Sequence, residues 1–129
     1  MVDEKKHVVI NVDDIEANRY AMTKILQRAG FESIEADSGY AALELINKYN
    51  PDCVVIDVNL PDFNGFELCK KIHENPKTAS IPVVHVSAIH VKIEDRETAY
   101  EDGADGYFVH PVDPREFILA IKSLIRIRE

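Results

Sequence analysis

The run Cys53-Val54-Val55-Ile56-Asp57 decides how the rest of the sequence is interpreted. Its apolar residues follow one another without alternating with polar ones, which is typical of a parallel strand buried on both faces. A strand of that kind needs helices on both sides of its sheet, so the flanking sequence should alternate between strands and helices. Asp57 ends the run and is therefore expected at the carboxyl edge of a central strand.

Short strand-like and helix-like segments do alternate along the chain. We expect strands over residues 7–12, 31–36, 53–56, 81–86 and 107–109. We expect helices over residues 15–29, between Ser38 and Asn50, over 66–73 and 91–101, and from residue 114 onward. Short connections between these βα units predict a single α/β domain over residues 1–129. We expect the doubly wound, flavodoxin-like strand order 2-1-3-4-5, with ligands bound beyond the carboxyl ends of the strands.

Single residues mark where several of these helices begin and end. Gly30 suits the position just after a helix, where a left-handed conformation is common. Ser38 is a suitable N-cap for the next helix, which Asn50-Pro51 stops. Asn64-Gly65 is interpreted as a turn before the third helix. Asp113-Pro114 opens the last helix with a capping side chain and a proline in the first turn.

Composition and charge argue against several classes of function. The chain has 129 residues, a net charge of −8 and a pI of about 5.1. A nucleic-acid-binding face is therefore not expected, nor is attraction to an anionic membrane. No apolar run approaches the roughly 20 residues of a membrane helix, and no secretory signal is present, so we expect a cytoplasmic protein.

The cysteines and two of the histidines are not expected to be functional. Cys53 and Cys69 are expected to be reduced core thiols. His85 and His90 are expected to be core or surface residues rather than metal ligands.

Carboxylates gather where the strands of the predicted sheet end. Asp13 and Asp14 follow the first strand and Asp57 ends the third, and these two strands are neighbours in the expected order. Two like charges about 4 Å apart repel by roughly 4 kcal/mol at an effective dielectric constant near 20, so a bound cation or a protonated carboxyl is needed. Oxygen ligands suit Mg²⁺ or Mn²⁺. We expect Asp14 to bind the metal directly, Asp13 to bind it through water, and Asp57 and the backbone carbonyl of Asn59 to complete the site.

The same cleft suits phosphoryl transfer. A carboxylate can act as a nucleophile and form an aspartyl-phosphate, with a metal ion lowering the charge of the phosphoryl oxygens. Asp57 is the candidate acceptor because it ends the most apolar strand. The Ser87 hydroxyl and the Ala88 backbone N–H follow the fourth strand and can donate hydrogen bonds to the phosphoryl group.

Five ordered blocks of sequence resemble the response-regulator receiver family of two-component signalling. They are Val12-Asp13-Asp14, Val55 to Asp62, Asn64-Gly65, Val86-Ser87-Ala88 and Gly103 to Tyr107. The resemblance covers residues 7–127 and implies a chemotaxis-regulator-like fold phosphorylated by a histidine kinase or a histidine phosphotransfer protein. It implies a domain that catalyses only its own phosphorylation and dephosphorylation. It also implies switching through Ser87 and Tyr107, with output or homodimerisation through the fourth helix, fifth strand and fifth helix.

The sequence departs from the family pattern after the last predicted strand. The family normally has a lysine before the proline there, whereas this chain has His110 before Pro111. A neutral imidazole does not supply the fixed positive charge of a lysine, although a carboxylate-rich pocket favours its protonated form. We expect phosphorylation to survive, with its coupling to the conformational switch weakened or made dependent on pH.

Three other functions share part of this pattern. A haloacid-dehalogenase-type phosphatase also uses aspartate and Mg²⁺, but it needs Asp-x-Asp after the first strand, where this chain has Asp13-Asp14, and usually a cap domain. A flavin-binding module needs N–H groups and hydroxyls in its first loop, which is acidic here. A pseudo-receiver, in which the same fold binds proteins or dimerises without phosphorylation, stays open because of His110.

Overall fold

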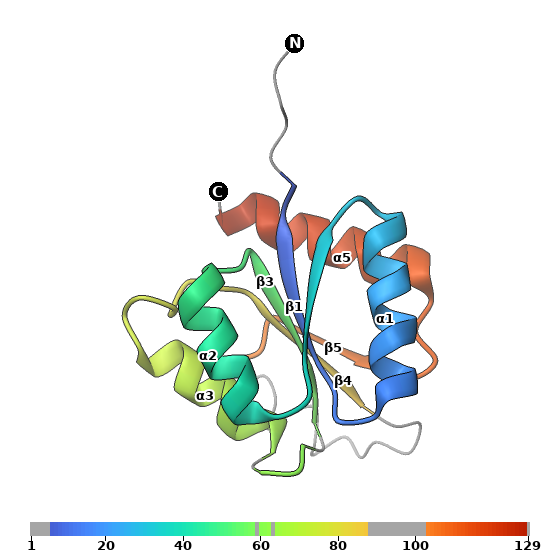
Figure 1. Cartoon of the computed structure of the whole chain (residues 1–129). Helices are drawn as coiled ribbons and strands as arrows, with labels where there is room; N and C mark the ends of the chain where they lie inside the picture. The colour runs from blue at the N-terminus through green and yellow to red at the C-terminus, as the bar shows by residue number, and fades with distance from the viewer. Residues whose placement is uncertain (1–5, 59, 63, 88–102, 129) are drawn as a thin grey trace.

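The computed structural model describes residues 6–58, 60–62, 64–87 and 103–128. Within these residues the chain forms a parallel sheet with helices on both sides (Figure 1). The strands are β1 (Val8–Val12), β2 (Glu32–Ala36), β3 (Cys53–Asp57), β4 (Val83–Ser87) and β5 (Gly106–Val109). They lie in the order β2-β1-β3-β4-β5, so the predicted doubly wound order is confirmed.

Helices cover both faces of this sheet and make a separate core on each. On one face lie α1 (Glu16–Arg28) and α5 (Pro114–Arg128), and on the other α2 (Gly39–Tyr49) and α3 (Gly65–Glu74) (Figure 1). Successive apolar residues of β3 alternate between the two cores, and each is at most 2% exposed. Burial on both sides explains why this strand is continuously apolar. The expected helix over residues 91–101 lies outside the described residues.

Several helix ends lie where single residues predicted them. The Ser38 side chain accepts a hydrogen bond from the Ala41 N–H at 3.1 Å and caps α2. Asp113 Oδ1 accepts from the Arg115 N–H at 2.9 Å at the start of α5. Gly30, just beyond α1, has a φ of 92°, a conformation that glycine adopts without steric cost. These contacts satisfy backbone groups that a helix end leaves unpaired.

Several elements begin one or two residues from the predicted position, and the starts of α3 and β4 have a clear physical reason. The interpretation of Asn64-Gly65 as a turn before the third helix is wrong, because Gly65 is the first residue of α3. Asn64 is its N-cap and accepts a hydrogen bond from the Glu67 N–H at 2.9 Å; asparagine suits caps as well as turns. Strand β4 begins at Val83, because Pro82 has no N–H to contribute to the ladder.

Among the described residues, two cysteines and one histidine are buried in the core. Cys53 and Cys69 are buried thiols, as predicted. His85 is fully buried in the core, while His90 lies outside the described residues. In the described part of the chain, none of the helices combines the length and the apolar character that crossing a bilayer requires.

Candidate functional site

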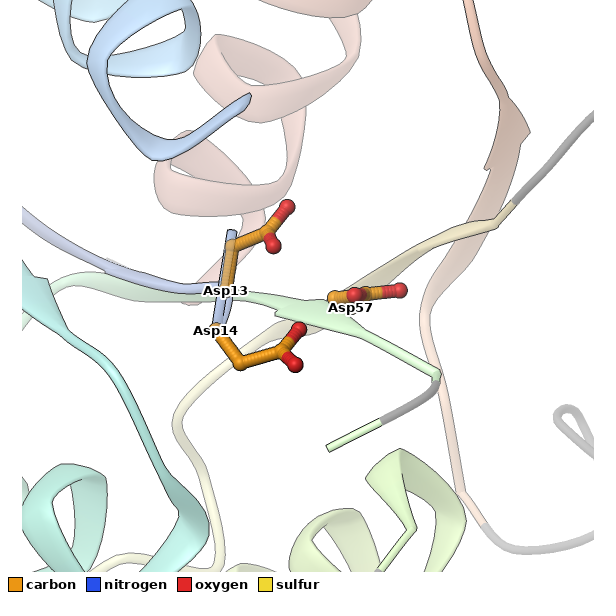
Figure 2. A group of neighbouring side chains, drawn as sticks. All are labelled: Asp13, Asp14 and Asp57. Atoms are coloured by element: carbon orange, nitrogen blue, oxygen red, sulfur yellow. The ribbon is translucent and has the colours of Figure 1, made fainter. Parts of the chain in front are cut away.

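The carboxyl ends of β1 and β3 bring three carboxylates together (Figure 2). Val12 at the end of β1 is paired with Ile56 in β3, so the residues that follow these positions lie side by side. One carboxylate oxygen from each of Asp13, Asp14 and Asp57 lies within 4.8 Å of the others. The convergence that the sequence predicted is therefore present in the fold, at the edge where doubly wound sheets bind ligands.

Asp13 is the most deeply buried of the three carboxylates. Only 5% of the residue is exposed, and its Oδ1 accepts a hydrogen bond from the Ile15 N–H at 2.9 Å. Burial raises the pKa of Asp13, and the charge of Asp14 raises it further. The Ile15 N–H and the positive charges of His110 and Arg19 lower it, but burial outweighs them. The ionised form of Asp13 is therefore disfavoured by burial and, to a lesser degree, by the charge of Asp14.

Asp13→Asn is expected to stabilise the metal-free protein at neutral pH, by on the order of 1 kcal/mol. A carboxyl whose pKa is raised by folding contributes stability below its unfolded pKa and loses it as the pH rises through its folded pKa. Asparagine removes that loss and keeps an oxygen for the Ile15 N–H. Urea denaturation in the presence of a chelator measures the difference, and a less stable variant would contradict the electrostatic argument.

The start of α3 is packed against the backbone that holds Asp57. The Gly65 N–H donates to the Val58 carbonyl at 2.7 Å. A Cβ on Gly65 would lie 2.7 Å from the Asp57 carbonyl oxygen and 2.9 Å from the Val58 Cα. Both neighbours are backbone atoms, so there is no flexible side chain to move aside. Glycine is therefore needed at position 65, where the start of α3 packs against the end of β3. In the sequence, only the pair Asn64-Gly65 indicates this requirement.

Gly65→Ala is expected to lower the free energy of unfolding by roughly 1–3 kcal/mol, the usual effect of overpacking. The added methyl must push the backbone of Asp57 and Val58 away from α3. Gly106→Ala is the matched control, because a Cβ there meets only ordinary contacts, the nearest 3.4 Å from a Val84 methyl. Urea denaturation of both variants tests this, and equal stability of the two would show that the close approach has no energetic consequence.

The other predicted site residues lie at the ends of β4 and β5 or outside the described residues. Ser87 ends β4 and is 7% exposed. The His110 N–H donates to the Ser87 carbonyl at 2.8 Å just beyond β5, and the charge of His110 acts on Asp13. Tyr107 lies within β5, with its hydroxyl buried. Asn59 and Ala88 lie outside the described residues. The functional roles given to these residues stay predictions.

Arg19 belongs to the site's support, although the sequence did not single it out. Its Nη1 donates to the Asp13 carbonyl at 2.9 Å, and its Nε pairs with Glu35 at 2.9 Å on β2. The Arg19 carbonyl accepts a hydrogen bond from the buried Asn11 side chain at 2.9 Å. These contacts fix the turn that carries Asp13. An arginine on a helix gives no signal of such a role, because the role depends on how β1 and β2 lie beside that helix.

Comparison with known proteins decides the family. The model of the response regulator receiver domain matches residues 9–122. The chain belongs to this family. It is 35% identical over 120 residues to the transcriptional regulatory protein SrrA of Staphylococcus aureus, covering 92% of this chain and 47% of SrrA. The receiver domain thus spans about half the length of the curated relatives it matches.

Solved structures agree with this receiver assignment. A structure from Chloroflexus aurantiacus J-10-fl is 32% identical, with a TM-score of 0.90 over 95% of this chain and 99% of that one. The chemotaxis protein CheY4 of Vibrio cholerae is 27% identical, with a TM-score of 0.85 over 93% of this chain and 99% of that one. The described receiver domain therefore has the CheY-like, flavodoxin-like fold that the sequence predicted.

Proposed function

We propose that this receiver domain accepts a phosphoryl group on Asp57 from a histidine kinase or a histidine phosphotransfer protein. The observation that carries the proposal is the convergence of Asp13, Asp14 and Asp57 within 4.8 Å at the carboxyl edge of the sheet. A carboxylate at the end of a central strand is held rigidly and is a suitable nucleophile. In the transfer, an Asp57 oxygen forms a bond to phosphorus as the bond from phosphorus to the donor's histidine nitrogen breaks.

The donor set fits a hard divalent cation. All three side chains offer carboxylate oxygens, which suit Mg²⁺ or Mn²⁺. Burial, and to a lesser degree the charge of Asp14, raises the pKa of Asp13, and a bound cation would favour its ionised form. We assign Asp14 as a direct ligand and Asp13 as a ligand through water, with Asp57 and the Asn59 carbonyl completing the set. When bound, the cation supplies charge neutralisation for the incoming phosphoryl oxygens.

Ser87 and Tyr107 are the proposed link between phosphorylation and output. The Ser87 hydroxyl and the Ala88 N–H would donate hydrogen bonds to the phosphoryl oxygens, drawing the end of β4 toward Asp57. Tyr107 would then change orientation and alter the face that includes β5 and α5. A partner protein, a further domain or a second copy of the receiver would bind that face. The domain would catalyse only its own phosphorylation and dephosphorylation.

His110 favours a second candidate function, that of a pseudo-receiver that binds partners without phosphorylation. The receiver family normally has a lysine at this position, and His110 brings a shorter side chain to the neighbourhood of Asp13. We favour the phosphorylated switch because the carboxylate cluster is intact. An imidazole N–H can still donate a hydrogen bond to a phosphoryl oxygen, although it does not replace a permanent charge.

Intact mass spectrometry separates the two candidates. The protein is incubated with Mg²⁺ and acetyl phosphate, a small phosphodonor that needs no partner kinase, and is then weighed whole. A gain of one phosphoryl group that disappears when a chelator is added supports the phosphorylated switch. An unchanged mass, with and without metal, supports the pseudo-receiver.

A further inference from the structure

A histidine lies in the core beneath the candidate site. His85 is the middle residue of β4 and is 0% exposed. It is paired with Ile56 of β3 on one side and with Tyr107 of β5 on the other. Because side chains alternate along a strand, His85 lies on the same face of the sheet as Ser87, two residues further on. It therefore neighbours both residues assigned to the switch.

The ring nitrogens of His85 are poorly satisfied by the described residues. Within residues 6–58, 60–62, 64–87 and 103–128, neither Nδ1 nor Nε2 makes a well-formed hydrogen bond, whereas nearly all buried polar groups in proteins make one. Burial lowers the pKa of His85 to about 4; the Ile56 carbonyl opposes this shift and the charge of His73 adds to it. The ring is therefore neutral at physiological pH, with one N–H to donate and one nitrogen to accept. Leaving such a group unsatisfied is unfavourable, so a conformation that satisfies it gains stability.

Two aromatic rings flank the imidazole. Phe66 of α3 stands edge-on to it at a centroid distance of 5.2 Å. Tyr107 of β5 also lies near it, with centroids 6.3 Å apart and ring planes inclined by 56°. The Phe66 ring has no hydrogen-bonding group beyond its face, whereas Tyr107 carries a hydroxyl that is buried in the same region. Because the ring centroids are 6.3 Å apart, a rotation of the rings can bring that hydroxyl and an imidazole nitrogen into hydrogen-bonding range.

We propose that His85 is a positioning residue for Tyr107, forming a hydrogen bond with the Tyr107 hydroxyl in the phosphorylated state. This inference rests on the proposed phosphorylation of Asp57. Without phosphorylation the His85 nitrogens are poorly satisfied by the described residues. A small movement of the end of β4 would therefore favour the conformation in which His85 and the Tyr107 hydroxyl are hydrogen-bonded. Ser87 would transmit this movement, because it binds the phosphoryl group in the proposed mechanism and lies on the same strand and face as His85. By linkage, a hydrogen bond that favours the phosphorylated state also favours phosphorylation.

Imidazole NMR tests the hydrogen bond directly. The ¹⁵N signals of the His85 ring are followed with Mg²⁺ alone and then with Mg²⁺ and acetyl phosphate, while intact mass reports phosphorylation in the same sample. We expect the two ring nitrogens to shift on phosphorylation in the wild type and to stay in place in Tyr107→Phe. A mass gain without a shift would overturn this inference alone. No mass gain would overturn the proposed function and this inference with it.

A double-mutant cycle tests the energetic coupling. His85→Leu and Tyr107→Phe are each expected to slow phosphorylation by acetyl phosphate roughly two- to tenfold, the equivalent of one net hydrogen bond. The double variant should be no slower than the slower single variant, because both remove the same interaction. Val84→Ala is the control: Val84 is 0% exposed on the same strand but packs in the other core, so its rate should stay unchanged. Fully additive single effects would contradict the proposed pairing.

Discussion

Asp57→Asn is expected to abolish covalent phosphorylation, leaving the intact mass unchanged after incubation with Mg²⁺ and acetyl phosphate. An amide oxygen is a poor nucleophile, and no other described carboxylate ends a central strand with two further carboxylates beside it. The change keeps the size and most of the polarity of the side chain. The fold should therefore persist, and circular dichroism should be unchanged.

The matched control for this variant is Asp37→Asn. Asp37 follows β2 at the same edge of the sheet and is exposed, so it undergoes the same chemical change outside the cluster. It should be phosphorylated at the wild-type rate. If Asp57→Asn still gains one phosphoryl group while Asp37→Asn does not, the acceptor has been assigned to the wrong residue.

Asp14→Asn is expected to weaken Mg²⁺ binding by about 10- to 100-fold. Replacing a residue that only supports a metal ligand typically weakens binding by that factor. Asp14 is proposed as a direct ligand, so its loss should weaken binding at least as much. Removing its charge also reduces the attraction of the cluster for a divalent ion. Asp14 is exposed and faces Asp57 (Figure 2), so the substitution should not disturb the core.

A titration with Mg²⁺ followed by amide NMR signals near β1 and β3 measures this loss. The phosphorylation rate at limiting Mg²⁺ should fall with the affinity and recover in part at high Mg²⁺. Asp37→Asn should bind Mg²⁺ as the wild type does. Equal affinities for all three proteins would show that Asp14 is not a ligand.

The order of helices and strands could be predicted because it depends on local sequence patterns. The continuous apolar run of β3 requires burial on both faces, and this requirement fixes helices on both sides of a parallel sheet. Ser38 and Asp113 cap helices through contacts within three residues, so the sequence alone contains both partners. Neighbouring β1 and β3 then brought Asp13, Asp14 and Asp57 together without further information.

The supporting residues could not be predicted because their roles depend on segments distant in sequence. Gly65 is required by the Asp57 carbonyl, and Arg19 holds a turn through contacts with β1 and β2. The sequence places His85 either in the core or on the surface, and its position beside Tyr107 emerges only from the register of β4 and β5. Chemical type indicates which side chains are reactive, whereas packing decides which residues hold them in place.

The most direct test of the central claim is a crystal structure of the protein grown with Mn²⁺, with the ion located by its anomalous scattering. We expect one peak between the carboxylates of Asp13, Asp14 and Asp57, in direct contact with at least Asp14 and Asp57. A map with no peak there, or with the ion bound elsewhere while the three carboxylates stay unliganded, would contradict the assignment of this cluster as the metal site that supports phosphorylation.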